Sequence, residues 1–421
     1  MTENGTFQIT VFEDLHFGEA EDLPWGPEQD TKTTNLVMST VLDNEEPQLV
    51  VLNGDLITGE NTHQANATSY IDQLVTPPVS RNLPWASTYG NHDSDINLSR
   101  QAIYDREKTY ANSLTRASLN TSDSGVSNYY LPIYADASTT APVYILYFFD
   151  SRGGSQPLPS SHDHQPDLQA SKKPIPSFVS PAVAQWFVRT SQSLEQQHNT
   201  SIPSIAFVHI PPHAFRTVQT LGLSPHRNPG VNDDDPLAAQ DEPDAGVYGG
   251  QDVEFMAALL NATMQNTHDD DDDYGDGDGD GDGDGDGDGD GDGDGDGDGD
   301  NHDRTAGGLR ALFSAHDHGD SWCAPWSAAV TDALPYRSAA MEGKKGPVLC
   351  FGQRSGYGGY GWWKRGARQI LLRPATGKSK GMEVETWIRY EDGSVAGRVV
   401  LNGTFGEDRY EGVPNRDSGQ E

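Results

Sequence analysis

Short apolar runs rich in β-branched and aromatic residues recur along the chain, and a polar cluster follows each of them. We interpret these runs as strands over 7–12 (FQITVF), 48–53 (QLVVLN), 83–89 (LPWASTY), 143–149 (VYILYFF), 204–209 (SIAFVH) and 309–315 (LRALFSA). Helical patterns lie between them, at about 33–44, from about 98 and at 252–260. A further helix begins where Pro181 follows Ser180, a preferred pair at a helix start. Strand, loop and helix in repeated order predict an α/β fold.

The C-terminal part has a different pattern, with strands and no helices between them. The runs are GPVLCFG, ARQILL, EVETWIRY and SVAGRVVL, and EDG before the last of them is a hairpin turn signal. We expect these strands to form a β-meander that completes a second sheet of the same domain.

Metal-binding residue types stand directly after several predicted strands. They are Asp14, His16, Asp55, Asn91, His92, His209, His316 and His318. Each motif alone is a weak signal, because an Asp-x-His pair is more often a turn and a surface histidine. Together they are informative, since reactive groups in α/β sheets gather at the carboxyl ends of strands.

Carboxylate, amide and imidazole donors suit hard or borderline divalent metals. If the strand ends are extended, residues two apart point the same way, so Asp14 with His16, and His316 with His318, would each aim two donors at one place. Seven donors, with His92 left aside, suit two ions that share a bridging carboxylate.

Five motifs resemble those of the calcineurin-like metallophosphoesterases. The family's motifs are D-x-H, G-D, G-N-H-[DE], H and G-H-x-H. The corresponding segments of this chain are DLH, GDLITG, GNHD, VHIP and AHDH, and they occur in the same order. WGPEQD, DSRGG and GYGGYG are similar to fungal single-domain members related to purple-acid-phosphatase-like proteins. The resemblance implies an α/β fold, an αββα sandwich of two mixed sheets with the C-terminal β-meander, in one domain over 1–410 with a tail over 411–421.

The resemblance also implies a role for each residue. The ligands of one metal ion would be Asp14, His16 and His318. Those of the other would be Asn91, His209 and His316, with Asp55 as the bridge. His92 would face the substrate and protonate the leaving oxygen or stabilise the phosphoryl charge.

The implied cofactors are two divalent or mixed-valence ions such as Mn, Fe or Zn, which would activate a bridging hydroxide. We therefore expect hydrolysis of phosphate esters, most simply monoesters, in a small phosphorylated substrate or a phosphoprotein. A phosphodiesterase with the same metal core is an alternative. A noncatalytic, acidic cation-binding protein is another.

Two departures from the family pattern qualify this expectation. Ala315 stands before His316 where a glycine is usual, and its methyl group should be tolerated unless φ is positive there. Thr58 stands where purple acid phosphatases carry a tyrosine, and their first motif lacks a counterpart of His16. No tyrosinate colour is expected.

An Asp-Gly tract dominates the charge of the chain. Residues 269–300 contain 18 Asp and no Lys or Arg, which is half of the net charge of −36. The tract does not fit a calcium-binding EF-hand loop, because Gly287 stands where a bidentate Glu is needed. We expect a disordered, solvated insertion over 268–305. The acidity argues against nucleic acid or an anionic membrane as a partner, and no apolar stretch of membrane-spanning length occurs.

The cellular compartment is suggested by two kinds of residue. The glycosylation sequon N-x-[ST] occurs, in mild excess over chance, at Asn4, Asn66, Asn97, Asn120, Asn199, Asn261 and Asn402. No signal peptide is visible in MTENGTF, and we expect that a leader has been removed from a secretory-pathway protein. Cys323 and Cys350 would form one disulfide there, or else remain two buried thiols.

Further candidates are weaker. His162 and His164 form a second His-Asp-His in a region that reads as a loop, and we interpret them as a decoy. Arg152 could reach a phosphate, but a turn is the better explanation, and His213 would face either substrate or solvent.

A glycine-rich stretch, GQRSGYGGYGWW, covers residues 352–363 and matches no nucleotide-binding motif. It would be either a packing loop between strands or a loop at the site with Tyr357 or Tyr360 on its rim.

Overall fold

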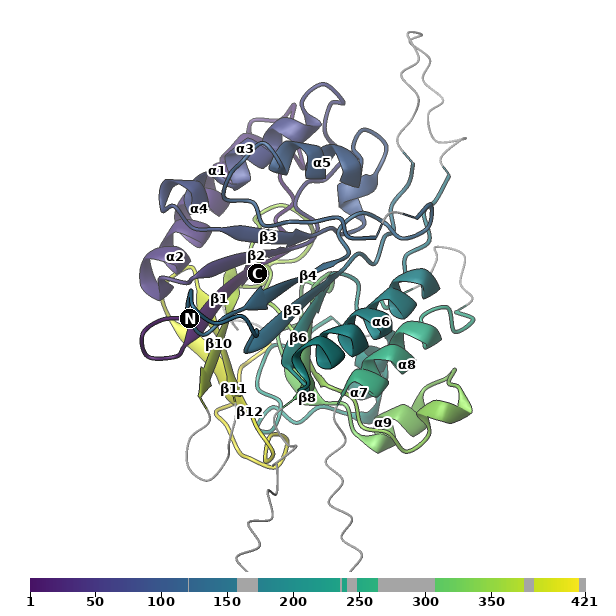
Figure 1. The fold of residues 1–421 in the computed structure, drawn as a ribbon. Coiled ribbons are helices and arrows are strands. Elements are labelled where there is room, and N and C mark those ends of the chain that lie inside the picture. Colours follow the sequence, from purple (N-terminus) through teal and green to yellow (C-terminus); the bar gives the residue numbers. More distant parts are fainter. Residues whose placement is uncertain are drawn as a thin grey trace, which may run out of the picture.

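The computed structural model describes residues 1–119, 121–156, 173–234, 237–240, 248–263, 307–374 and 382–415. Two six-stranded sheets pack face to face, with helices outside each of them (Figure 1). The first sheet has the order β12-β11-β10-β1-β2-β3. Its strands are β1 (Phe7–Phe12), β2 (Leu49–Asn53), β3 (Trp85–Thr88), β10 (Gly366–Pro374), β11 (Met382–Tyr390) and β12 (Val395–Leu401).

The second sheet has the order β4-β5-β6-β7-β9-β8. Its strands are β4 (Tyr129–Ile133), β5 (Tyr144–Phe149), β6 (Pro203–Val208), β7 (Gly308–Ser314), β8 (Cys323–Pro325) and β9 (Val348–Phe351). Both sheets mix parallel and antiparallel pairs. The predicted α/β sandwich of two mixed sheets is confirmed.

The helices divide by chain order between the two outer faces (Figure 1). Outside the first sheet are α1 (Trp25–Lys32), α2 (Ser39–Glu45), α3 (Tyr70–Leu74), α4 (Thr76–Ser80) and α5 (Arg100–Glu107). Outside the second are α6 (Pro181–His198), α7 (His213–Leu221), α8 (Val253–Ala262) and α9 (Ala328–Ala333). No helix in the described part of the chain is long and apolar enough to cross a membrane.

Three apolar clusters correspond to the three interfaces between these layers. The middle cluster joins the inner faces of the two sheets, for example Val11 and Val51 from one and Phe148 and Phe207 from the other. The outer clusters bury the remaining faces against the helices. Alternate strand residues therefore face different layers, but both layers are apolar, which explains why the strands read as continuous apolar runs.

Most predicted strands are present within two residues of their expected bounds. The first predicted helix begins earlier than expected, because α1 continues through a π-helical turn, Thr33–Met38, into α2. The helix predicted from Pro181 is α6, and the Ser180 hydroxyl accepts a hydrogen bond from the Val183 N–H at its start. The edge strands β4 and β8 and the helices α3, α4, α7 and α9 were not predicted.

The expectation for the C-terminal strands was only partly right. Strands β10, β11 and β12 do form an antiparallel meander with the turn at Glu391–Gly393. They extend the sheet of β1 instead of completing a second one, because β10 pairs with β1. GPVLCFG does not join them: β9 pairs with β7 and β8 in the other sheet. Apolar pattern alone does not specify which strand is the partner.

Cys323 on β8 and Cys350 on β9 form a disulfide, so the alternative of two free thiols was wrong. The predicted disordered insertion over 268–305 lies outside the described residues. The division into one domain over 1–410 and a tail over 411–421 stays a prediction.

Glu107 at the end of α5 should make the free energy of unfolding depend on pH. Its side chain is fully buried and accepts a hydrogen bond from the Ser87 hydroxyl at 2.8 Å. Burial raises the pKa of Glu107 to about 7. The folded state therefore prefers the protonated form, and this stabilisation is complete below the ordinary pKa and is lost as pH rises through about 7. We expect the Glu107→Gln variant to lose about 3 kcal/mol of the pH dependence of unfolding between pH 4 and 8, measured by urea titration.

The control for this prediction is Asp105→Asn, which changes an exposed carboxylate on the same helix. It should leave the pH dependence as in the wild type. A Glu107→Gln profile parallel to that of the wild type would contradict the prediction.

Candidate metal centre

The predicted ligands lie in the loops after β1, β2 and β3 of the first sheet and after β6 and β7 of the second. Within each sheet these strands are parallel, so their carboxyl ends lie at the same edge. Backbone hydrogen bonds join neighbouring loops: the Leu15 N–H donates to the Asp55 carbonyl at 2.9 Å, and the Ala315 N–H donates to the His209 carbonyl at 3.0 Å. Packing of the two sheets then brings both sets of loops together.

Four of the candidate ligands have a left-handed backbone. The φ angles are 50° for Asp14, 49° for His16, 48° for Asp55 and 81° for His316. The expectation of extended strand ends was therefore wrong, and the donors converge because the chain turns sharply after each strand. Such angles cost non-glycine residues on the order of 1–3 kcal/mol each and persist where function requires them. Ala315 has no positive φ, which agrees with the expectation that its methyl group is tolerated.

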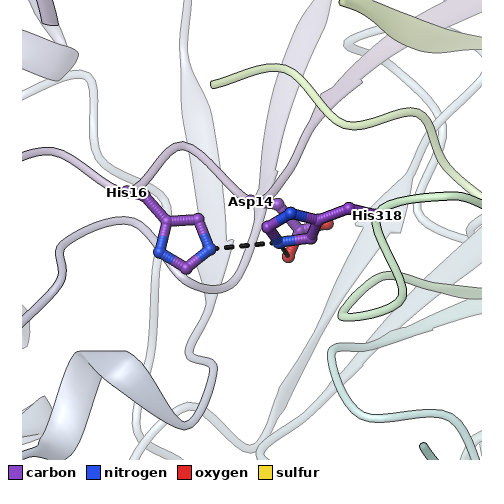
Figure 2. A group of neighbouring side chains, drawn as sticks. All are labelled: Asp14, His16 and His318. Carbon is purple, nitrogen blue, oxygen red and sulfur yellow. Dashed lines mark hydrogen bonds and ion pairs between the residues drawn. The ribbon is translucent and has the colours of Figure 1, made fainter. Parts of the chain in front are cut away.

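Asp14, His16 and His318 form a first cluster, in which each residue offers a ligand atom within 4.8 Å of the others (Figure 2). The Nε2 atoms of the two histidines are 3.2 Å apart, and Asp14 Oδ1 is 3.7 Å from His318 Nε2. The Nδ1 atom of His318 is 2.9 Å from the Tyr360 carbonyl oxygen. A carbonyl oxygen only accepts, so Nδ1 carries the hydrogen and Nε2 presents a lone pair.

The chemistry of the first cluster fits a cation. Asp14 Oδ2 is buried and has no hydrogen-bond partner within the described part of the chain. Burial lowers the pKa of His16 to about 3 and holds the pKa of His318 well below its usual value, so both rings are neutral. A buried carboxylate beside imidazole lone pairs is costly unless a metal ion or proton lies between them.

Asp55, His209 and His316 form a second cluster with the same spacing. His209 Nδ1 is 2.9 Å from the Asn53 carbonyl oxygen, so its Nε2 faces Asp55 Oδ2, 3.0 Å away. Burial opposes a charge on His209, but the Asp55 carboxylate outweighs it and raises the pKa of His209 to about 9. In the neutral ring, His209 Nε2 is an acceptor, as is Asp55 Oδ2. Their contact therefore requires a cation between them, which is a proton when no metal is bound.

Asn91 lies beside the second cluster. A Cβ atom on the preceding Gly90 would lie 2.2 Å from Asp55 Oδ1 and 2.7 Å from His209 Cδ2, so this loop packs directly on both residues. Asn91 Oδ1 is buried and has no hydrogen-bond partner among the described residues. A buried amide oxygen of this kind fits the predicted role of a metal ligand.

Asp55 contacts both clusters. Its Oδ2 atom is 3.0 Å from His209 Nε2 in the second cluster and 3.9 Å from His16 Nε2 in the first. Its Oδ1 atom accepts a hydrogen bond from the His92 N–H at 2.9 Å. The carboxylate therefore stands where a bridging ligand is needed.

His92 lies next to the clusters without belonging to either. Its ring centre is 5.0 Å from that of His16, and its Nδ1 atom is 2.5 Å from Glu60 Oε1. Burial opposes protonation, but Asp55 and Glu60 outweigh it and raise the pKa of His92 to about 10. Because Nδ1 faces Glu60, Nε2 is the nitrogen that can donate toward the clusters. Glu60 was missed in the sequence, where nothing distinguishes it from other acidic loop residues.

The glycine-rich loop over 352–363 borders the first cluster. A Cβ atom on Gly359 would lie 2.5 Å from His318 Cε1 and 2.7 Å from His16 Cδ2. The Tyr360 ring stacks on the His318 ring at 4.1 Å, whereas the Tyr357 hydroxyl donates to Glu391. The alternative of a loop at the site is therefore right, and Tyr360 is the tyrosine whose ring contacts a candidate ligand.

We expect a Gly359→Ala variant to bind metal more weakly at the first cluster. The added methyl group must displace a ligand ring, and disturbance of ligand orientation typically costs about 10–100-fold in affinity. The matched control is Gly343→Ala, because Gly343 has a similar φ of 68° and open space around its Cβ position. Calorimetric titration with Mn²⁺ measures the effect, and equal affinities in the two variants would contradict it.

The weaker candidates belong to neither cluster or lie outside the described residues. His213 is buried at the start of α7, with Nδ1 3.2 Å from Asp252 Oδ2, so it does not face solvent. Arg152 packs over the Phe178 ring and donates from Nε to the Phe178 carbonyl, which agrees with a structural role. The decoy residues His162 and His164 are among the residues that the structure does not describe.

Comparison with known proteins identifies relatives over most of the chain. The family model for calcineurin-like phosphoesterase matches residues 7–249. Phosphatase DCR2 of Saccharomyces cerevisiae is 31% identical over 239 residues, which cover 54% of this chain and 38% of that protein. Probable inactive purple acid phosphatase 29 of Arabidopsis thaliana is 23% identical over 420 residues, covering 92% of this chain and 83% of that protein. This chain thus spans much less than half of the yeast relative.

Solved structures with a similar arrangement include a dimetal phosphatase from Danio rerio, with a TM-score of 0.45 and 11% identity over 94% of this chain and 98% of that one. Purple acid phosphatase PPD1 from yellow lupin has a TM-score of 0.37 and 10% identity, covering 94% of this chain and 54% of its own. The family model accounts for more than half of the sequence, and this protein belongs to the calcineurin-like phosphoesterase family.

Proposed function

We propose that this protein hydrolyses phosphate esters, most simply monoesters, with two metal ions bound by the two clusters. The observation that carries the proposal is the position of Asp55, whose carboxylate contacts a histidine of each cluster while the ring of His92 lies beside them. Family membership supports the same chemistry.

Each residue of the centre has a part in this proposal. The ligands of one ion are Asp14, His16 and His318, and those of the other are Asn91, His209 and His316, with Asp55 shared. Two ions in such a centre supply Lewis acidity, which lowers the pKa of a water molecule and neutralises charge on the phosphoryl oxygens. His92 is the proton donor: Glu60 holds its Nδ1, which leaves Nε2 to protonate the leaving oxygen.

The substrate would be a small phosphorylated molecule or a phosphoprotein. A phosphodiesterase is the alternative enzyme, since the same donor set supports both reactions. The test is hydrolysis of p-nitrophenyl phosphate against bis-p-nitrophenyl phosphate, with the metal-stripped protein reloaded with Mn²⁺, Zn²⁺ or iron. We expect higher kcat/KM for the monoester. A higher kcat/KM for the diester would show that the protein is a phosphodiesterase and not a phosphomonoesterase.

A noncatalytic cation-binding role is the remaining alternative, and some plant relatives carry names that call them probably inactive. This chain retains donors at both clusters as well as His92 and its partner Glu60, which a cation-binding role does not need. Absence of hydrolysis of either ester by protein carrying two ions per chain would favour this alternative.

We also propose that the protein matures in the secretory pathway. The disulfide between Cys323 and Cys350 suits an oxidising compartment. Five of the sequon asparagines are exposed, namely Asn4, Asn66, Asn199, Asn261 and Asn402. We expect the intact mass of the native protein to exceed the polypeptide mass by one or more N-glycans, removable by an amidase specific for them. A mass equal to the polypeptide alone would contradict this.

A further inference from the structure

A short chain of hydrogen bonds runs from Glu19 through Thr58 to His16. The Thr58 hydroxyl donates to Glu19 Oε2 at 2.8 Å, and its oxygen is 3.0 Å from His16 Nδ1. Thr58 is almost fully buried, and so is His16. Glu19 does not reach the ring itself, because its Oε2 atom is 3.9 Å from His16 Nδ1. Thr58 is therefore the link between the carboxylate and the ring.

The direction of these hydrogen bonds determines which nitrogen of His16 carries the hydrogen. A hydroxyl group has one hydrogen, and here it is used on the carboxylate of Glu19. Toward His16 the hydroxyl oxygen can only accept, so Nδ1 must be the N–H. His16 Nε2 then presents its lone pair toward the first cluster.

When no metal is bound, a hydrogen bond to His318 would stabilise the opposite, Nε2–H, tautomer of His16. His16 Nε2 is 3.2 Å from His318 Nε2, which is a lone pair because the Tyr360 carbonyl holds the hydrogen of His318 on Nδ1. A hydrogen on His16 Nε2 would therefore form a hydrogen bond to His318. In that arrangement neither His16 Nε2 nor His318 Nε2 would have a lone pair available for a metal ion.

We propose that Thr58, held by Glu19, is a positioning residue that selects the Nδ1–H tautomer of His16 and so keeps the first cluster open to a metal ion. The inference rests on the proposed role of His16 as a ligand. It goes beyond the proposed function, because it assigns the preference between two tautomers to a side chain that touches neither metal nor substrate. Hydrogen-bond partners of this kind commonly contribute about 10–100-fold to metal affinity.

The test compares Thr58→Val, which removes the hydroxyl at nearly constant shape, with Thr58→Ser, which keeps it. The matched control is Thr62→Val, because the Thr62 hydroxyl is equally buried in the same loop but donates to the Gly59 carbonyl. Each full-length variant is labelled with ¹⁵N-histidine. The tautomer of His16 is read by NMR after the metal is stripped, and Mn²⁺ affinity is measured by calorimetric titration.

We expect Thr58→Val to move His16 toward the Nε2–H tautomer and to weaken one of two Mn²⁺ sites by about 10–100-fold, with the other site unchanged. Thr58→Ser and Thr62→Val should behave as the wild type. An unchanged tautomer in Thr58→Val, or two sites of wild-type affinity, would overturn the inference. Failure of the proposed function is distinct: wild-type protein that binds two ions and shows the expected tautomer but hydrolyses no ester refutes the hydrolysis alone.

Discussion

The Asp55→Asn variant is expected to lose bound metal from both clusters and to lose hydrolysis with it. Asp55 is the carboxylate that contacts a histidine of each cluster, and the amide that replaces it is neutral and has one oxygen in place of two. Loss of an outer hydrogen-bond partner alone costs about 10–100-fold in affinity or activity, and loss of a shared ligand should cost more. Elemental analysis of the purified variant, beside monoester hydrolysis, measures both effects.

The control for this experiment is Asp43→Asn. Asp43 is an exposed carboxylate paired with Arg81, so it undergoes the same chemical change away from the centre. It should retain two ions per chain and full activity. If Asp55→Asn instead hydrolyses the ester as fast as the wild type, the proposed enzyme function is wrong.

The His92→Ala variant is expected to keep both ions and to lose activity by about 10²–10⁴-fold in kcat, the usual contribution of a general acid. His92 bonds to Asp55 only through its backbone N–H, which alanine retains, so the clusters should remain intact. Its side chain bonds to Glu60 and packs edge-on against the His16 ring, but it offers no ligand atom to either cluster. The combination of full metal content and low kcat separates proton donation from metal binding.

His63→Ala is the matched control for this variant, because His63 is an exposed histidine paired with Asp22. It should have wild-type kcat and metal content. A His92→Ala protein that lost metal would assign His92 to the ligands, and one with wild-type kcat would exclude it as the proton donor.

The candidate ligands could be proposed from the sequence because they stand in the loops that follow runs of apolar residues. Phe7–Phe12 and Leu49–Asn53 are apolar enough to specify strands by themselves, and Asp14 and Asp55 follow at once. Parallel strands place their carboxyl ends at one edge, so the donors were expected to be neighbours. The reason given for convergence was nevertheless wrong, since left-handed turns and not extended ends aim Asp14 and His16 at the same place.

Other features depend on contacts between residues far apart in the chain. Apolar periodicity did not show that β10 pairs with β1, because the pairing depends on which exposed edge the folded domain offers. Glu60 beside His92 and Thr58 beside His16 carry no local signal, since an acidic or hydroxyl residue in a loop is ordinary.

The sequence by itself determined most of the strands, the α/β class and the set of candidate donors that follow those strands, because apolar period and the order of chemical groups are local properties. Only the tertiary structure decided which donors share a cluster, that Asp55 lies between the two, and which histidine nitrogens face inward. These outcomes depend on distances of a few ångströms between residues that are far apart in the sequence. His16 and His318 are an example, because packing of the two sheets brings them together.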